Sequence, residues 1–218
     1  MIGNTPAVLL VSNQSMIVPT KNTSMMNKLI TITSILLLSL IVVQLSAQAF
    51  KLNTRKSEVA VLGTSTIHDW EIVCKELSGN AQIQISERKL NGIKNLEFQV
   101  VVKSMESGKG LMNNKTYDAL EEEEHPTIKY KLSEVKNITS ETNGSFTITA
   151  LGMLTIAGKT NNISHEVTAI VSGKEIIFSG EYHLDMTTYD VAPPTAMMGT
   201  IKTGKEVTIK FETTFLIN

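Results

Sequence analysis

Apolar and polar residues alternate strictly along several stretches of the chain. Between residues 79 and 86, a glycine, an alanine and two isoleucines occupy the odd positions, whereas polar residues occupy the even positions. The same period of two recurs over residues 96–102, 176–184 and 207–217. This period is typical of strands with one apolar and one polar face. About eight or nine such strands, separated by turn residues, predict an all-β fold, an antiparallel eight-stranded β-barrel with an apolar interior.

One segment breaks the strand pattern and predicts the only helix of the barrel domain. Tyr117 and Leu120 lie three residues apart, four glutamates follow them, and Pro126 prevents continuation. A short helix is therefore expected over about 115–124. The four glutamates are interpreted as the solvated end of this helix rather than as a metal site.

The sequence marks two tight turns, but it does not mark the facing of the first strand. Asn91-Gly92 and Asn143-Gly144 are typical of the tight turns of β-hairpins. Residues 51–65 also alternate, but apolar residues fall on both faces of this stretch. The pattern therefore leaves the facing of the first strand undetermined.

The first 49 residues have the organisation of an export signal rather than of a folded domain. A short positive region at residues 26–28 precedes an apolar and hydroxyl-bearing run, and Ala47-Gln48-Ala49 provides a small-x-small cleavage pattern. Residues 26–49 are therefore predicted to be a cleaved signal peptide, which implies a periplasmic or secreted protein. The alternative is a membrane anchor over residues 29–45, although a run of this length with four hydroxyl side chains is marginal for spanning a bilayer.

Residues 1–25 precede a better start of the signal peptide at Met25 or Met26. They are interpreted as a non-native or disordered extension. The remaining residues, 50–218, form one domain of ordinary size and are assigned to the barrel.

Charge and cysteine content narrow the function classes. Only two of the 20 basic residues, Lys21 and Lys28, and none of the 21 acidic residues precede Phe50, so residues 50–218 carry a net charge of −3. This balance gives no basic surface for nucleic acid. The single Cys74 has no partner for an internal disulfide and is interpreted as a buried or half-buried thiol.

No catalytic signature is present in the sequence. It contains no nucleophile elbow, no phosphate-binding glycine loop and no zinc-protease motif. The four histidines are scattered without metal-ligand spacing. His165 aligns with apolar neighbours and is expected to be a satisfied interior histidine. We therefore expect neither an enzyme nor a bound metal or cofactor.

His68 and Trp70 form the most suggestive polar and aromatic pair. An indole ring packs on apolar matter while its N–H retains a polar partner. Trp70 is the only tryptophan of the chain. It is interpreted either as a plug that seals one end of the barrel or as a contact for a ligand at the cavity mouth, and the two roles are compatible.

Four groups of residues, in order along residues 50–218, resemble the motifs of the YceI-like family. The groups are Ser57-x-Val59 with His68-x-Trp70 and Gly79; Ser107 to Lys115 with Tyr117-x-Ala119-Leu120 and His125-Pro126-Thr127-Ile128; Gly152-x-Leu154-Thr155-Ile156-x-Gly158-Lys159-Thr160; and Met186-Thr187-x-Tyr189 with Pro193 to Gly204. The resemblance implies a lipocalin-like, elongated eight-stranded barrel. It also implies an exported, non-enzymatic protein with an apolar tunnel for a polyisoprenoid or a similar amphiphilic lipid, such as a quinone.

The alternation and the resemblance lead to one hypothesis, reversible capture of an isoprenoid chain inside the barrel. Apolar positions on the inward faces are the candidate lining, and three residues are candidate contacts near the head group. The lining set is Ile83, Ile85, Phe98, Val100, Ile128, Tyr130, Phe146, Ile148, Val167, Phe178, Tyr182, Ile209 and Phe211, and the head-group set is His68, Trp70 and His125.

The competing hypothesis is a barrel filled by its own side chains that acts as a periplasmic protein-interaction module. Cavity volume distinguishes the two, because a solid core has no room for a lipid tail. The 11 aromatic residues and the small residues on the inward face favour an open interior. Transient membrane contact and a homodimer are further expectations for the partners, whereas nucleic acid is not expected.

Overall fold

The computed structural model describes residues 47–218. The predicted extension 1–25 and the predicted signal peptide up to residue 46 lie outside the described residues, as does the alternative anchor 29–45. Within residues 47–218, no helix is both long and apolar enough to cross a membrane.

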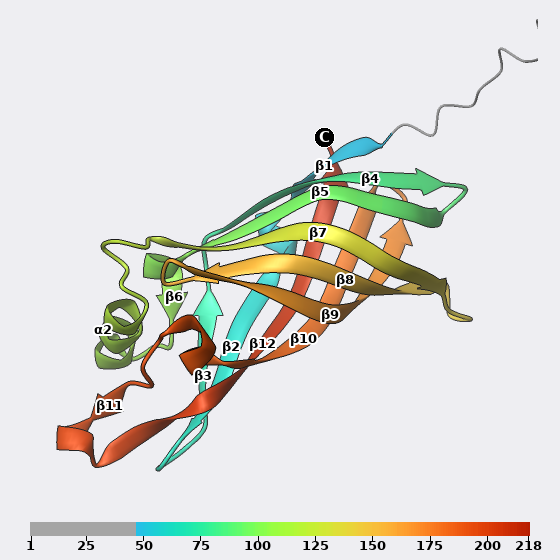
Figure 1. Ribbon diagram of the computed structural model, residues 1–218. Coiled ribbons are helices and arrows are strands. Elements are labelled where there is room, and N and C mark those ends of the chain that lie inside the picture. The colour runs from blue at the N-terminus through green and yellow to red at the C-terminus, as the bar shows by residue number, and fades with distance from the viewer. Residues whose placement is uncertain (1–46) are drawn as a thin grey trace, which may run out of the picture. The chain divides into compact units, whose positions relative to one another are not determined.

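Strands dominate the described part of the chain (Figure 1). They are β1 (Gln48–Leu52), β2 (Glu58–Ser65), β3 (Trp70–Cys74), β4 (Leu77–Ser86), β5 (Lys89–Val101), β6 (Met105–Glu106), β7 (Thr127–Ser140), β8 (Ser145–Ile156), β9 (Lys159–Ser172), β10 (Glu175–Asp185), β11 (Thr195–Ala196) and β12 (Ile201–Ile217). The helices are α2 (Gly110–Ala119) and the 3₁₀ turns η1 (Thr54–Lys56), η2 (Val102–Ser104), η3 (Met186–Tyr189) and η4 (Met197–Gly199).

Eight strands close into an antiparallel barrel in the order β1-β4-β5-β7-β8-β9-β10-β12. Pairing of β12 with β1, which places Phe50 opposite Ile217, closes the ring. The long strand β12 also pairs with β2, and β2, β3 and β6 extend the wall at one end. The predicted fold class, an all-β eight-stranded barrel, is confirmed.

The alternating apolar residues form the core, as their period requires. Ile83, Ile148 and Ile176 are almost completely buried, and each lies on a strand whose neighbouring residues are more exposed. Phe178 and Phe215 come from adjacent strands and make an edge-to-face contact with 5.7 Å between ring centroids. Such contacts stabilise the barrel through area burial and ring geometry.

One of the two predicted hairpin turns is wrong. Asn143-Gly144 lies in the β7–β8 turn, where Gly144 has a φ of 83°. Asn91-Gly92 instead lies within β5, and the β4–β5 turn is formed by Glu87 and Arg88, both with positive φ. The core decides this register, because the turn at 87–88 pairs Ile83 with Ile93 and Ile85 with Leu90.

The helix begins and ends five residues earlier than predicted over 115–124. Helix α2 ends at Ala119, and Glu121 adopts a positive φ of 53° in the turn that follows. Continuation would place the carboxylates of residues 121–124 at the helix C-terminus, where the helix dipole disfavours negative charge. The acidic run is therefore a turn rather than a helical end.

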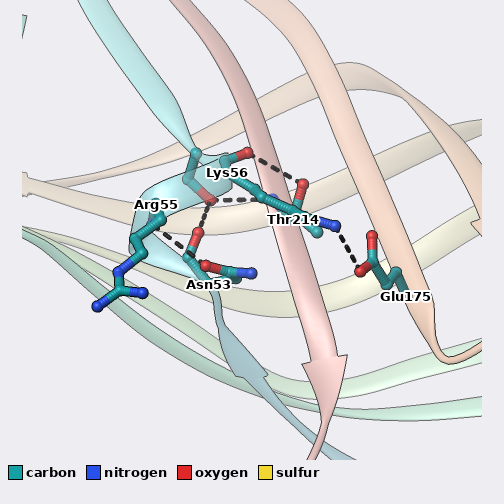
Figure 2. A network of polar contacts seen from close by, with 6 residues as sticks. Asn53, Arg55, Lys56, Glu175 and Thr214 are labelled. Atoms are coloured by element: carbon teal, nitrogen blue, oxygen red, sulfur yellow. Dashed lines mark hydrogen bonds and ion pairs between the residues drawn. The ribbon is translucent and has the colours of Figure 1, made fainter.

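The ambiguous facing of residues 51–65 has a structural cause. The 3₁₀ turn η1 separates β1 from β2. The buried residues are even-numbered in β1, whereas Val59 and Ala60, on opposite faces of β2, are both buried. Polar contacts fasten this interruption to β12 and β10 (Figure 2). The Thr214 side chain donates to the Lys56 carbonyl, and the Lys56 amine lies 2.7 Å from a Glu175 carboxylate oxygen.

Candidate ligand-binding site

The barrel encloses an inner cavity of about 170 Å³. Its wall is almost entirely apolar and includes side chains from most strands of the barrel. Ten of the residues predicted to line a tunnel lie on this wall: Phe98, Val100, Ile128, Tyr130, Ile148, Val167, Phe178, Tyr182, Ile209 and Phe211. An interior of this kind excludes water and favours hydrocarbon.

Three other predicted lining residues lie outside the inner cavity. Ile83 and Phe146 are buried within the core, and Ile85 is half-buried against it. The alternation identifies the inward face of β4 and β8 correctly, but it does not distinguish an inward residue that packs on others from one that faces open space.

A second, outer cavity of about 310 Å³ adjoins the first. It lies at the end of the barrel that carries α2 and β11 (Figure 1), and side chains of both elements line it. Four side chains belong to the walls of both cavities: Val61, Met105, Ile128 and Ile209. These residues form the boundary between the two cavities, and the interior is therefore hollow along this part of the barrel rather than solid.

Two of the three predicted head-group residues lie at the outer cavity. His68 is exposed and Trp70 is half-buried, and both line the cavity wall. The Trp70 indole N–H donates to the Thr64 carbonyl at 2.9 Å, and its ring lies against Gly63. This placement is compatible with both interpretations of Trp70, because the ring closes part of the wall and also contacts the cavity.

The third predicted head-group residue, His125, lies apart from both cavities. Its ring packs against Gly158 in the β8–β9 turn and is 3.7 Å from a Glu121 carboxylate oxygen. Within residues 47–218, Glu121, Glu124 and His125 also form the only group whose potential metal-ligand atoms lie within 4.8 Å of one another. Both glutamates are exposed, so the arrangement is that of a surface turn.

A small polar cluster interrupts the apolar wall of the inner cavity. The His165 ring makes edge contacts with Tyr130 and Tyr182, at centroid distances of 5.3 and 6.1 Å. Burial lowers the pKa of His165 and raises the pKa of Tyr130 to about 12. The expectation that His165 is a satisfied interior histidine is only half correct, because its buried Nδ1 has no hydrogen-bond partner.

Fourteen residues of the inner wall were not selected from the sequence. They are Val59, Val61, Cys74, Ile93, Leu96, Met105, Leu132, Val135, Ala150, Leu154, Ile163, His165, Thr213 and Phe215. Alternation would have identified several of them, such as Leu96 and Leu154. It could not place Val135, since irregularities in the β7–β8 ladder on both sides of this residue shift its facing.

The thiol of Cys74 is buried in the wall, in agreement with its interpretation as a structural cysteine. Burial raises the pKa of this thiol to about 12. The protonated form is therefore the one present at neutral pH, and a protonated thiol is a poor nucleophile.

Comparison with known proteins identifies the family. The YceI-like domain model matches residues 50–215. BcnA of Burkholderia cenocepacia has a similar structure, with a TM-score of 0.60 and 21% identity over 75% of this chain and 98% of BcnA. A polyisoprenoid-binding domain of Saccharophagus degradans, implicated in plant cell wall breakdown, gives a TM-score of 0.60 and 13% identity over 78% and 99% of the two chains.

A YceI protein of Campylobacter jejuni gives a TM-score of 0.53 with 17% identity, over 68% of this chain and 85% of that protein. No curated protein sequence matches the chain. The domain match spans most of the sequence, and the similar solved structures have the same fold. This chain belongs to the YceI-like family.

Proposed function

We propose that this protein binds the hydrocarbon chain of an amphiphilic lipid, such as a polyisoprenoid or a quinone, and carries or sequesters it. The observation that supports this function most directly is the pair of adjoining apolar cavities of about 170 and 310 Å³ inside the barrel. Taken together, the two volumes fall in the lower part of the range of small-molecule sites, about 300–1,000 Å³. The polyisoprenoid-binding domain of S. degradans has the same fold. The proposed role requires no catalytic step.

Burial of hydrocarbon supplies enough free energy for such a role. Removing about 500 Å² of tail surface from water contributes roughly 12 kcal/mol at about 25 cal/mol per Å². Association and ordering costs offset about half of this gain. The balance of about 6 kcal/mol corresponds to a dissociation constant on the order of tens of micromolar.

We further propose that the protein is exported and collects its ligand at a membrane surface. The organisation of residues 26–49 supports export, with anchoring by residues 29–45 as the alternative. Ile67, Leu111, Met197 and Met198 are large exposed apolar residues at or next to the outer cavity. Two lysines, Lys109 and Lys115, also line that cavity and favour contact with anionic lipid.

The alternative of a self-filled interaction module requires a solid interior. Both cavities weigh against it, because the side chains around them leave space that they do not fill. The lipid-binding proposal therefore has the stronger structural support.

The test is to purify the protein from its host and to detect any lipid adduct by native mass spectrometry. The lipid is then extracted and identified by its mass. Ile209→Trp adds bulk at the boundary between the two cavities and should reduce the lipid adduct at least tenfold. Met153→Trp adds the same ring at an exposed position outside both cavities and should retain the adduct. Absence of any lipid from the parent protein, or equal loading of both variants, would contradict the proposal.

A further inference from the structure

The inner cavity contains one buried polar atom whose hydrogen-bonding capacity is unused. The Nδ1 atom of His165 has no partner, whereas the hydroxyl of Thr213, another polar residue of the wall, donates to the Phe178 carbonyl at 3.4 Å. Leaving a buried ring nitrogen without a hydrogen bond is unfavourable. A partner supplied by a ligand would remove this penalty.

The His165 ring lines the inner cavity, but its Nδ1 is itself covered by protein atoms, so a ligand hydrogen-bonds this nitrogen only after the ring has turned. The β9–β10 ladder ends at the pair Ser179 and Thr168, although both strands continue beyond this point. Continuation of the same register would place Tyr182 opposite His165. The two rings therefore lie opposite each other on the two strands, just beyond the last paired residues. Their centroids are 6.1 Å apart.

The third ring of the cluster is held in place by a glycine. Tyr130 on β7 lies over Gly152 on β8, where an added Cβ would lie only 2.4 Å from the tyrosine Cε2 atom. The absence of a side chain at Gly152 therefore lets Tyr130 reach His165 at a centroid distance of 5.3 Å. Three strands, β7, β9 and β10, thus bring one imidazole and two phenol rings together inside an otherwise apolar wall.

The charge state of the cluster limits the chemistry of its partner. Burial lowers the pKa of His165 and raises the pKa of both Tyr130 and Tyr182, which favours the neutral form of all three groups. Within the described residues, no Lys, Arg, Asp or Glu lines the inner cavity. A phosphate or carboxylate would therefore be buried there without a counter-charge, which is strongly unfavourable. A neutral hydroxyl or carbonyl matches the donor and acceptor of a neutral imidazole.

We propose that His165, flanked by Tyr130 and Tyr182, hydrogen-bonds an uncharged hydroxyl or carbonyl group of the ligand inside the barrel. The polar group of the lipid then lies at the inner cavity, and its hydrocarbon extends toward the outer cavity. This arrangement differs from the sequence-based expectation that His68, Trp70 and His125 contact the head group. The inference rests on the proposed lipid-binding function and specifies the chemical class of the ligand.

The test compares two ligands that differ by one hydroxyl group, geranylgeraniol and the hydrocarbon in which hydrogen replaces that hydroxyl. Their competition for the delipidated full chain is measured by native mass spectrometry. The parent protein should prefer the alcohol by about tenfold, which corresponds to a hydrogen bond of ordinary net strength. His165→Phe should abolish this preference and retain binding of the hydrocarbon, which also shows that the variant is folded.

His165→Asn places an amide near the position of Nδ1 and should restore part of the preference. His183→Phe, at an exposed position bonded to Thr208, is the matched control and should behave as the parent protein. Equal binding of both ligands by the parent protein, or a preference for the alcohol that survives in His165→Phe, would overturn the inference alone. Failure of the parent protein to bind either ligand would overturn the proposed function together with it.

Discussion

At the scale of single residues, glycines decide where aromatic rings of the cavity walls lie. An added Cβ at Gly63 would lie 2.1 Å from the Trp70 ring, and one at Gly152 would lie 2.4 Å from the Tyr130 ring. Neither glycine needs an unusual backbone conformation, since neither has a positive φ. Their role is therefore to leave space for a ring, which is a tertiary requirement.

Replacing Gly63 by alanine tests this role. The added methyl group must displace the Trp70 ring, so Gly63→Ala should lower the free energy of unfolding by about 1–3 kcal/mol, the usual cost of overpacking. Because Trp70 is the only tryptophan, its fluorescence should shift to longer wavelength as the ring becomes exposed. Urea unfolding monitored by fluorescence measures both effects.

Gly110→Ala is the matched control, because a methyl group added at this first residue of α2 would meet no neighbouring side chain or strand within 4 Å. Its effect on stability should stay within about 0.5 kcal/mol. An unshifted emission spectrum and unchanged stability for Gly63→Ala would contradict this role of Gly63, because the wall would then accept the methyl group without moving Trp70.

At the scale of elements, the barrel closes through an interrupted strand. The turn η1 lies between β1 and β2, both of which pair with β12. The Ser57 hydroxyl donates to the Asn53 carbonyl and accepts from the backbone N–H of the buried Thr214. One hydroxyl group thus joins both ends of the interruption to the neighbouring strand.

Removing this hydroxyl should therefore weaken closure of the barrel. Ser57→Ala leaves the Thr214 N–H without its acceptor and should lower the free energy of unfolding by about 1–3 kcal/mol. Lys56→Met, in the same turn, removes only the solvent-exposed ion pair with Glu175 and should lower it by about 0–1 kcal/mol. Thermal and urea unfolding of the two variants give the comparison, and equal losses would contradict the role assigned to Ser57.

At the scale of the whole barrel domain, the features that favour lipid uptake gather at one end. Helix α2 and strand β11 lie at this end in Figure 1, and the C-terminus lies at the other. The outer cavity, its two lysines and most of the large exposed apolar residues of the described chain belong to the same end. An apolar rim with adjacent positive charge is the combination that binds anionic membrane surfaces.

Leu111→Asp should slow uptake of lipid from anionic vesicles at least tenfold, because it places a carboxylate on the apolar rim. The amount of lipid bound at equilibrium should fall less than the rate, since Leu111 is 69% exposed and the inner cavity is untouched. Ile170→Asp introduces the same charge at an exposed apolar residue that lines neither cavity and should leave the rate unchanged. Fluorescent-lipid transfer measures the rates, and equal rates for all three proteins would exclude the rim as the docking surface.

Whether a sequence-based prediction is correct depends on how far apart in the sequence the interacting residues lie. Alternation of apolar and polar residues is local, and it correctly predicts the barrel. Ten of the residues that it selects as ligand contacts lie on the inner cavity wall. The turn predicted at Asn91-Gly92 is wrong because the pairing of Ile83 with Ile93 outweighs a strong local turn signal. The contact between His165 and Tyr182 joins two strands at a point where they no longer pair, and no local pattern reports it.

The sequence by itself determined the fold class, the family resemblance and the absence of a catalytic motif, because these depend on residue type and on spacing within single strands. Only the tertiary structure decided which inward side chains pack on one another and which surround open space. It also decided that β1 and β2 are separated by a turn and that one histidine nitrogen lies buried without a partner. These features depend on how distant strands meet, and the period of two is the same whether the centre of a barrel is filled or hollow.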